Sequence, residues 1–157
     1  MIRIITDSTC EAPPEVLQHP AVTVIPLTVV FGQEALRDGI EITREQFWSR
    51  LPTSNPLPST SQATPADFSG LFDQYSQGGD EVIALLLSSK LSGTISSALL
   101  AQDGLPGRPI SVVDSKSISV GLGIMLQEAL AMAGKGASRQ AIVERMEHMR
   151  ERMQIIF

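Results

Sequence analysis

Two hydroxyl-rich segments are the places where this sequence could bind a small anion. Residues 88–94 read Ser-Ser-Lys-Leu-Ser-Gly-Thr and follow directly on the apolar run 82–87, whereas residues 59–62 read Ser-Thr-Ser-Gln and precede a helix start. Hydroxyl groups donate hydrogen bonds to anions, and Gly93 lets a ligand approach the backbone closely. For each segment taken alone, the plainer interpretation is an ordinary polar turn with solvated serines.

Segment 88–94 lies where an open parallel sheet binds its ligands. Such sites form beyond the carboxyl ends of the strands, where helix N-termini present free amide groups and a partial positive charge. Ser92 and Thr94 place two hydroxyl groups at a predicted helix start. We therefore predict an oxyanion site at this turn, for a carboxylate or a phosphate.

The other polar groups favour scaffolding over chemistry. Asp7 and Asp114 also follow predicted strands, but a carboxylate repels an anion and more often caps a helix or fixes a loop. His19 and His148 are expected to be solvated, and the sequence holds neither a Gly-x-Ser-x-Gly elbow nor metal-ligand spacing. Hydroxyl groups without a base or a metal favour binding over turnover. The alternative is an enzyme that uses the oxyanion site, such as a phosphotransferase or an esterase.

Composition narrows the class of protein. The chain has 157 residues, a net charge of −5 and 43% hydrophobic residues, which suits one domain with a real core and makes nucleic acid a poor partner. The single cysteine, Cys10, excludes an internal disulfide and fits a reducing cytoplasm. The longest apolar run, residues 82–87, has six residues against about 20 for a membrane span. We expect a cytoplasmic protein without a signal peptide, membrane segment, metal or cofactor.

Short apolar runs alternate with helical patterns along the chain. Strands are predicted at Arg3–Thr6, Val22–Leu27, Glu81–Leu87 and Ile110–Val113, with Thr28–Phe31 considered as a continuation of the second strand beyond a kink at Pro26. Helices are predicted from their caps at 43–50, 64–75, 92–99, 118–132 and from 138 onwards, with residues 56–62 as a loop between the first two. Strands that are apolar on both faces predict an α/β fold, a parallel sheet with helices on both faces.

Several motifs recur in an order and spacing typical of one family. They are Asp7-Ser8-Thr9, Pro26-Leu27-x-Val29-x-Phe31, Asp38-Gly39, Thr60-Ser61-Gln62 with Pro65 and Phe68, residues 88–94, and Asp114-Ser115. Over essentially all of its length the chain resembles the DegV family of bacterial fatty-acid-binding proteins. The resemblance implies an N-terminal α/β domain followed by a second α/β domain, with a long-chain fatty acid such as palmitate as the ligand.

The family's carboxylate site carries over to matching positions of this chain. The hydroxyl groups of Thr60 and Ser92 would bind the carboxylate, Gly93 and Thr94 would offer backbone amides beside it, and Ser61 belongs to the same motif. Members of the kinase-partner type present the carboxylate to a separate ATP-dependent fatty-acid kinase subunit. The resemblance therefore implies a lipid-binding protein and not an enzyme.

The same resemblance sets the expected domain boundaries. Residues 1–154 would form the N-terminal domain, and residues 155–157 would start a strand leading into the second domain, which is absent from this chain. The Gly-Gly-Arg segment and the C-terminal histidine of the family are absent with it. An apolar face left open in this way would favour self-association.

Overall fold

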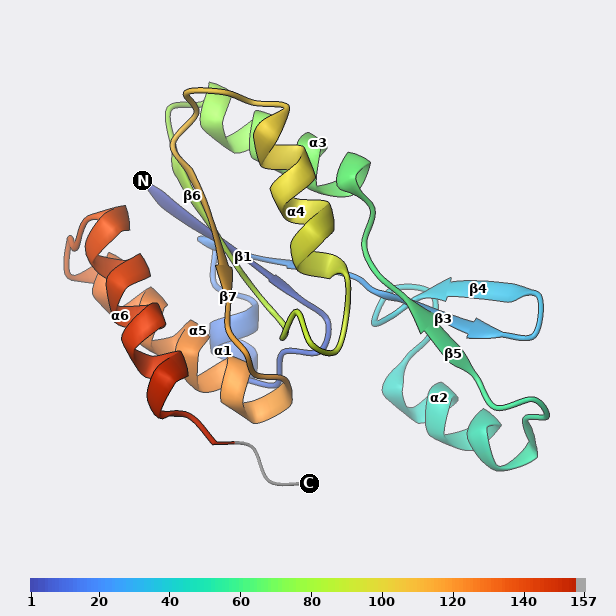
Figure 1. Cartoon of the computed structure of the whole chain (residues 1–157). Helices are drawn as coiled ribbons and strands as arrows, with labels where there is room; N and C mark the ends of the chain where they lie inside the picture. The colour runs from blue at the N-terminus through green and yellow to red at the C-terminus, as the bar shows by residue number, and fades with distance from the viewer. Residues whose placement is uncertain (155–157) are drawn as a thin grey trace.

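A four-stranded parallel sheet forms the centre of the computed structural model, which describes residues 1–154 (Figure 1). Its strands are β1 (Ile2–Asp7), β2 (Val22–Ile25), β6 (Glu81–Leu86) and β7 (Ile110–Asp114), in the order β2-β1-β6-β7. Residues 82–86 are fully buried, because β6 is an internal strand that is covered on both faces. The predicted parallel sheet and its four strands are confirmed.

Helices cover both faces of this sheet. α3 (Pro65–Gln77) and α4 (Thr94–Asp103) contact each other and pack on β6 and β7, whereas α5 (Ser119–Gly134), α6 (Arg139–Arg152) and the short α1 (Pro14–Leu17) lie on the opposite face (Figure 1). Fully buried apolar helix side chains complete the core with the strands: Phe68, Phe72, Ala98, Leu122, Met125, Leu126, Ala129, Ile142 and Met146. The predicted fold class is therefore confirmed.

Residues 28–61 form a small lobe that projects from one side of this body, which we call the main lobe (Figure 1). The small lobe consists of β3 (Thr28–Phe31), β4 (Glu34–Arg37), β5 (Ser59–Ser61), α2 (Arg44–Arg50) and a 3-10 turn (Leu51–Thr53). Its strands are antiparallel in the order β4-β3-β5. The rings of Phe31 and Phe47 lie 5.8 Å apart between centroids, which joins α2 to β3.

Two sequence predictions about the small lobe are wrong. Thr28–Phe31 does not continue the second strand, because the chain leaves the parallel sheet at Pro26 and starts β3 in the separate antiparallel sheet. The predicted loop at residues 56–62 contains a strand, β5, in which Thr60 lies opposite Val29. Its three hydroxyl residues have no apolar alternation, and pairing with β3 satisfies their backbone groups instead. The strand predicted at residues 155–157 lies outside the described residues.

The helix starts predicted at Thr43 and Thr64 are confirmed, and both have the form of a capping box. The Gln46 amide donates to the Thr43 hydroxyl at 3.2 Å while the Thr43 amide donates to the Gln46 side chain at 2.8 Å. The Asp67 amide and the Thr64 hydroxyl form the same pair at 3.2 Å, with the Thr64 amide 2.8 Å from the Asp67 carboxylate. These caps fix the starts of α2 and α3, which flank the segment that carries Thr60.

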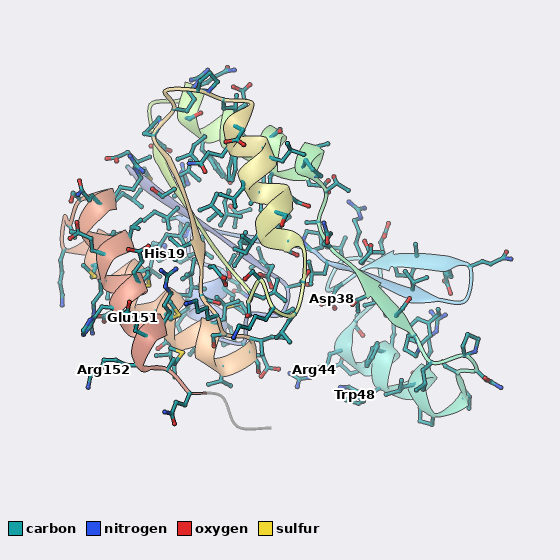
Figure 2. The ribbon with its side chains drawn as sticks, viewed as in Figure 1. His19, Asp38, Arg44, Trp48, Glu151 and Arg152 are labelled. Carbon is teal, nitrogen blue, oxygen red and sulfur yellow. The ribbon has the colours of Figure 1, made fainter. Side chains whose placement is uncertain are left out.

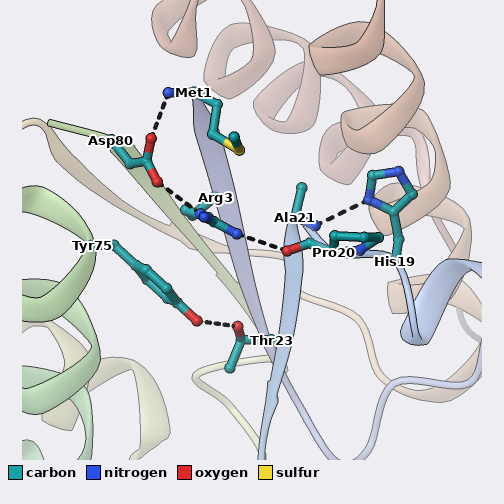
Figure 3. Close-up of polar contacts among 8 residues, drawn as sticks. All are labelled: Met1, Arg3, His19, Pro20, Ala21, Thr23, Tyr75 and Asp80. Atoms are coloured by element: carbon teal, nitrogen blue, oxygen red, sulfur yellow. Dashed lines mark hydrogen bonds and ion pairs between the residues drawn. The ribbon is translucent and has the colours of Figure 1, made fainter. Parts of the chain in front are cut away.

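Polar contacts join residues at the amino ends of the strands in the main sheet (Figure 3). The ammonium group of Met1 and the guanidinium of Arg3 donate to the Asp80 carboxylate at 2.6 and 2.8 Å, and together they hold the pKa of Asp80 below its usual value. Arg3 also lies over the Tyr75 ring, whose hydroxyl group is 2.7 Å from that of Thr23. The opposite end of the sheet, at the carboxyl ends of the strands, carries the turns after β1, β6 and β7, which include the hydroxyl-rich segment 88–94.

Candidate functional site

The carboxylate of Asp7 holds two turns together at the carboxyl edge of the main sheet. It is fully buried and accepts hydrogen bonds from the Leu87 amide at 2.7 Å and from the Thr9 amide and hydroxyl at 3.1 and 2.5 Å. Burial raises the pKa of Asp7 above its usual value, although the hydrogen bonds from Thr9 and Leu87 oppose the rise. The turn after β1 is thereby fixed against the end of β6.

Asp114 plays the same part between the turns after β6 and β7. It accepts hydrogen bonds from the Ser89 amide and hydroxyl at 3.1 and 2.6 Å and from the Lys116 amide at 3.0 Å. Burial acts to raise the pKa of Asp114, but these hydrogen bonds outweigh it and hold the pKa below its usual value. The prediction that Asp7 and Asp114 serve as scaffolding is confirmed by these contacts.

The turn between β6 and α4 presents Ser92 and Gly93 at the start of the helix. The hydroxyl oxygens of Ser92 and Thr94 are 2.9 Å apart, and the Thr94 amide, which the resemblance assigns to the carboxylate, donates to the Ser92 hydroxyl at 3.3 Å. Thr94 is fully buried, whereas Ser92 and Gly93 are half-buried. Within residues 1–154 the amides of Gly93 and Ile95 have no hydrogen-bond acceptor. An anion at this turn would meet the Ser92 hydroxyl and these amides first.

The small lobe brings Thr60 and Ser61 to the same place. With Ser92 and Gly93 they line one open cavity of about 750 Å³. Thr9 and Gln62 add further polar groups, and the rest of the lining is apolar: Leu27, Leu87, Leu91 and Ile118. Four of the five predicted site residues therefore lie around one cavity with Thr94 bonded behind Ser92, although Thr60 belongs to the small sheet and not to the rim of the parallel one. Their role in binding stays a prediction.

A second open cavity, also of about 750 Å³, adjoins the first at Thr60 and was missed by sequence reasoning. Trp48 and Arg44 of α2 line it from the small lobe, and Figure 2 shows them on the side of α2 nearest the main lobe. Cys10 lines it from the main lobe, and burial raises the pKa of its thiol to about 11, which keeps it protonated at neutral pH. Its walls come from segments that only folding brings together, so no local sequence signal marks it.

Among residues 1–154, no acid–base group lines the first cavity. None of the described residues that line it has an ionisable side chain. The Ser92 hydroxyl is hydrogen-bonded to the hydroxyl and the amide of Thr94, and not to a base. His19 and His148 are exposed, and His19 accepts a hydrogen bond from the Ala21 amide (Figure 3). In the described part of the chain no three His, Cys, Asp or Glu side chains gather as a metal site. The arrangement can orient an anion and contact an apolar group.

The helices of both lobes are short or carry polar residues. No helix within residues 1–154 combines the length and the apolar composition that crossing a bilayer requires.

Comparison with known proteins places this architecture in a family. The model of the DegV family, described as uncharacterised proteins, matches residues 1–157. A DegV domain-containing protein from Caldanaerobacter subterraneus is 36% identical over 142 residues, which are 90% of this chain and 50% of that protein. A second, from Deinococcus radiodurans, is 36% identical over 148 residues, which are 94% of this chain and 52% of that protein. The chain thus spans about half the length of the curated relatives it matches.

Solved structures share the fold over nearly the whole chain. A DegV family protein from Thermus thermophilus, described by its fatty acid binding, matches with a TM-score of 0.87 and 35% identity over 96% of this chain and 53% of that one. DegV from Bacillus subtilis, described as a fatty acid binding protein, matches with a TM-score of 0.85 and 32% identity over 96% of this chain and 54% of that one. Since the family model covers every residue, the chain belongs to the DegV family.

Proposed function

We propose that this chain binds a long-chain fatty acid and holds its carboxylate at the rim shared by the two lobes. The hydroxyl groups of Thr60 and Ser92 donate to the carboxylate, with Ser61 and the Gly93 amide beside it. The observation that carries the proposal is a single cavity that is lined by hydroxyl groups from both lobes and by apolar side chains. Relatives described as fatty-acid-binding proteins support this class of ligand.

The apolar tail supplies most of the affinity in this proposal. Each methylene removed from water contributes about 0.8 kcal/mol, and the lining residues Leu27, Leu87 and Ile118 offer apolar contact. Leu91 is 55% exposed in the free chain and would lose water on binding. The hydroxyl groups orient the ligand through charge-assisted hydrogen bonds, which are stronger than neutral ones.

The carboxylate stays at the open rim, where a separate ATP-dependent fatty-acid kinase subunit can reach it. Among the described residues, the cavity lining offers no base to activate a hydroxyl group and no positive side chain to stabilise a transferred phosphoryl group. These features support a role in which the chain binds and presents the fatty acid while the kinase performs the chemistry.

Titration of the purified chain with palmitate tests the proposal, with calorimetry for affinity and native mass spectrometry for stoichiometry. We expect one fatty acid per chain and roughly 10- to 100-fold weaker binding for Ser92→Ala or Thr60→Ala. The reason is that each variant removes one hydrogen bond to a charged group, worth about 1.5–3 kcal/mol. Ser69→Ala on α3 makes the same chemical change away from the cavity and should bind like the wild type.

Two outcomes would count against the proposal. The first is a purified chain that binds no palmitate, and the second is palmitate affinity that stays unchanged in both Ser92→Ala and Thr60→Ala. Hydrolysis or phosphoryl transfer that is lost in Ser92→Ala, without fatty acid binding, would favour the enzymatic alternative. Transfer of phosphate from ATP to the bound fatty acid by a kinase subunit is the separate test of presentation.

A further inference from the structure

The two parts of the proposed carboxylate site lie on lobes that touch each other little. Thr60 belongs to the small lobe and Ser92 to the main lobe, and the chain crosses between the lobes at residues 26–27 and 62–64. Among the described elements, no strand or helix of the small lobe packs extensively on one of the main lobe, and the small lobe stands out to one side in Figure 1. The separation of Thr60 from Ser92 therefore depends on a few individual contacts.

Three side-chain contacts tie the small lobe and its two connecting segments to the main lobe near the cavities. In the first connection, the Leu27 amide donates to the Ser8 hydroxyl at 3.0 Å. Arg44 of α2 and Glu11 form an ion pair at 3.2 Å, but both side chains are largely exposed, so water and salt weaken it. Gln62, which directly follows β5, donates through Nε2 to the Ser97 hydroxyl at 2.9 Å. Ser97 lies on α4 and is only 3% exposed. The Gln62 contact therefore joins the connecting segment directly after β5 to a buried group of the main lobe.

The path of the Gln62 side chain requires a glycine at position 93. A Cβ atom on Gly93 would lie 2.1 Å from Gln62 Oε1 and 2.8 Å from its Cδ, so a side chain there would occupy the space of Gln62. The φ angle of Gly93 is −76°, which other residues adopt freely. The glycine is thus needed for the contact and not for the backbone conformation.

We propose that Gln62 is a positioning residue that acts through Ser97. By holding the end of β5 against the start of α4, it sets the separation of Thr60 and Ser92 so that both hydroxyl groups reach one carboxylate. The inference rests on the proposed function, since it concerns the same site. The contact exists in the free chain, so its effect on the small lobe is measurable without any fatty acid.

Ser97→Ala separates positioning from direct contact with the ligand. Gln62 lines the cavity and could touch a ligand itself, whereas Ser97 does not line it. We expect Ser97→Ala and Gln62→Ala each to weaken palmitate binding about three- to tenfold, the net value of one hydrogen bond. The double variant should bind no more weakly than Gln62→Ala alone, because both changes remove the same contact. Gln74→Ala, on the exposed side of α3, is the matched control and should leave the affinity unchanged.

Trp48 reports directly on the small lobe, because it is the single tryptophan of the sequence and lies on α2. Time-resolved fluorescence anisotropy of the ligand-free chain should show a larger amplitude of nanosecond motion for Gln62→Ala and Ser97→Ala than for the wild type. A role in stability alone would leave this amplitude unchanged at temperatures where the variants are folded. Gly93→Ala should raise it as well, by displacing Gln62, and should add nothing in the Gln62→Ala background.

The outcomes distinguish this inference from the proposed function. Wild-type Trp48 motion and wild-type palmitate affinity in Ser97→Ala would overturn the positioning role and leave the proposed function standing. Raised Trp48 motion in the variants, with no palmitate binding even by the wild type, would overturn the proposed function and with it the purpose assigned to the contact.

Discussion

Replacing Asp7 by alanine removes the acceptor that holds two turns of the site together. The fully buried carboxylate accepts hydrogen bonds from the Leu87 amide at 2.7 Å and from both the amide and the hydroxyl of Thr9. Leu87 and Thr9 both line the first cavity, so the same carboxylate supports the fold and the shape of the site. The Asp7→Ala variant is therefore expected to lose stability, and under the proposed function it should also bind palmitate more weakly in the same titration.

The size of the stability loss follows from the groups left without a partner. A buried amide such as that of Leu87 costs about 1–3 kcal/mol when its acceptor is removed, and the two donors of Thr9, which is half-buried, add about 1 kcal/mol each. Burial raises the pKa of Asp7, so ionisation of the native carboxyl group already opposes folding, and its removal recovers part of the loss. We expect a net decrease of about 2–4 kcal/mol in the free energy of unfolding at neutral pH.

The raised pKa of Asp7 predicts how its contribution to the free energy of unfolding changes with pH. A carboxyl group whose native pKa exceeds its unfolded value stabilises the fold fully below the unfolded value, here about 3.8, and loses that stabilisation as the pH rises through the native pKa. The side-chain amide that Asp7→Asn introduces does not titrate. The free energy of unfolding of the wild type, minus that of Asp7→Asn, should therefore decrease as the pH rises from 3.8 towards neutrality.

Urea unfolding followed by circular dichroism, at several pH values between about 4 and 7, measures the stability loss of Asp7→Ala and the pH dependence of the difference between the wild type and Asp7→Asn. Asp103→Asn on α4 makes the same change at an exposed position and is the control. The reasoning is refuted if Asp7→Ala loses less than about 1 kcal/mol, or if the difference between the wild type and Asp7→Asn grows as the pH rises.

Three further predictions concern the framework and are checked by urea unfolding. Gly123→Ala should destabilise the chain by about 1–3 kcal/mol, because the added Cβ would lie 1.9 Å from the Glu11 carbonyl oxygen. Gly70→Ala, which has open space around it in α3, should stabilise the chain by up to about 1 kcal/mol. Equal effects of the two changes would contradict this reasoning. Thr64→Ala should cost about 1 kcal/mol through loss of the α3 cap, and an unchanged unfolding midpoint would contradict it. Asp80→Asn should lower the free energy of unfolding by up to about 1 kcal/mol at neutral pH, through loss of the ion pairs with Met1 and Arg3. This loss should vanish as the pH falls below 3.8, the unfolded pKa of Asp80, and through its lower native pKa. A loss that persists in acid would contradict the ion-pair explanation.

Local chemistry made much of the main lobe predictable. Every side chain in the run 82–87 is apolar, which predicts a strand covered on both faces. Residues 82–86 of β6 are fully buried in this way. The starts of α2 and α3 follow from Thr43 and Thr64, because a capping box forms between residues three positions apart and needs no distant partner. The hydroxyl-rich segment 88–94 was also visible locally, whereas Thr60 was assigned to the proposed site only through the resemblance to the DegV family.

The small lobe could not be predicted in the same way. β5 has three hydroxyl residues and no apolar alternation, so its extended form depends on hydrogen bonds to β3, some 30 residues earlier in the chain. The break at Pro26 was visible, but its consequence, a second sheet, depends on which strands pair. The cavity between Trp48 and Cys10 has the same origin, since the two residues meet only after both lobes have folded.

The sequence by itself therefore determined the helix starts, the buried strands and the positions of the hydroxyl-rich segments, because these features are encoded within a few residues. Only the tertiary structure decided that Thr60 and Ser92 come from different lobes and face one cavity, and that Gln62 reaches Ser97 across Gly93. The physical reason is that strand pairing and side-chain contacts between distant segments depend on the path of the whole chain, which no local pattern records.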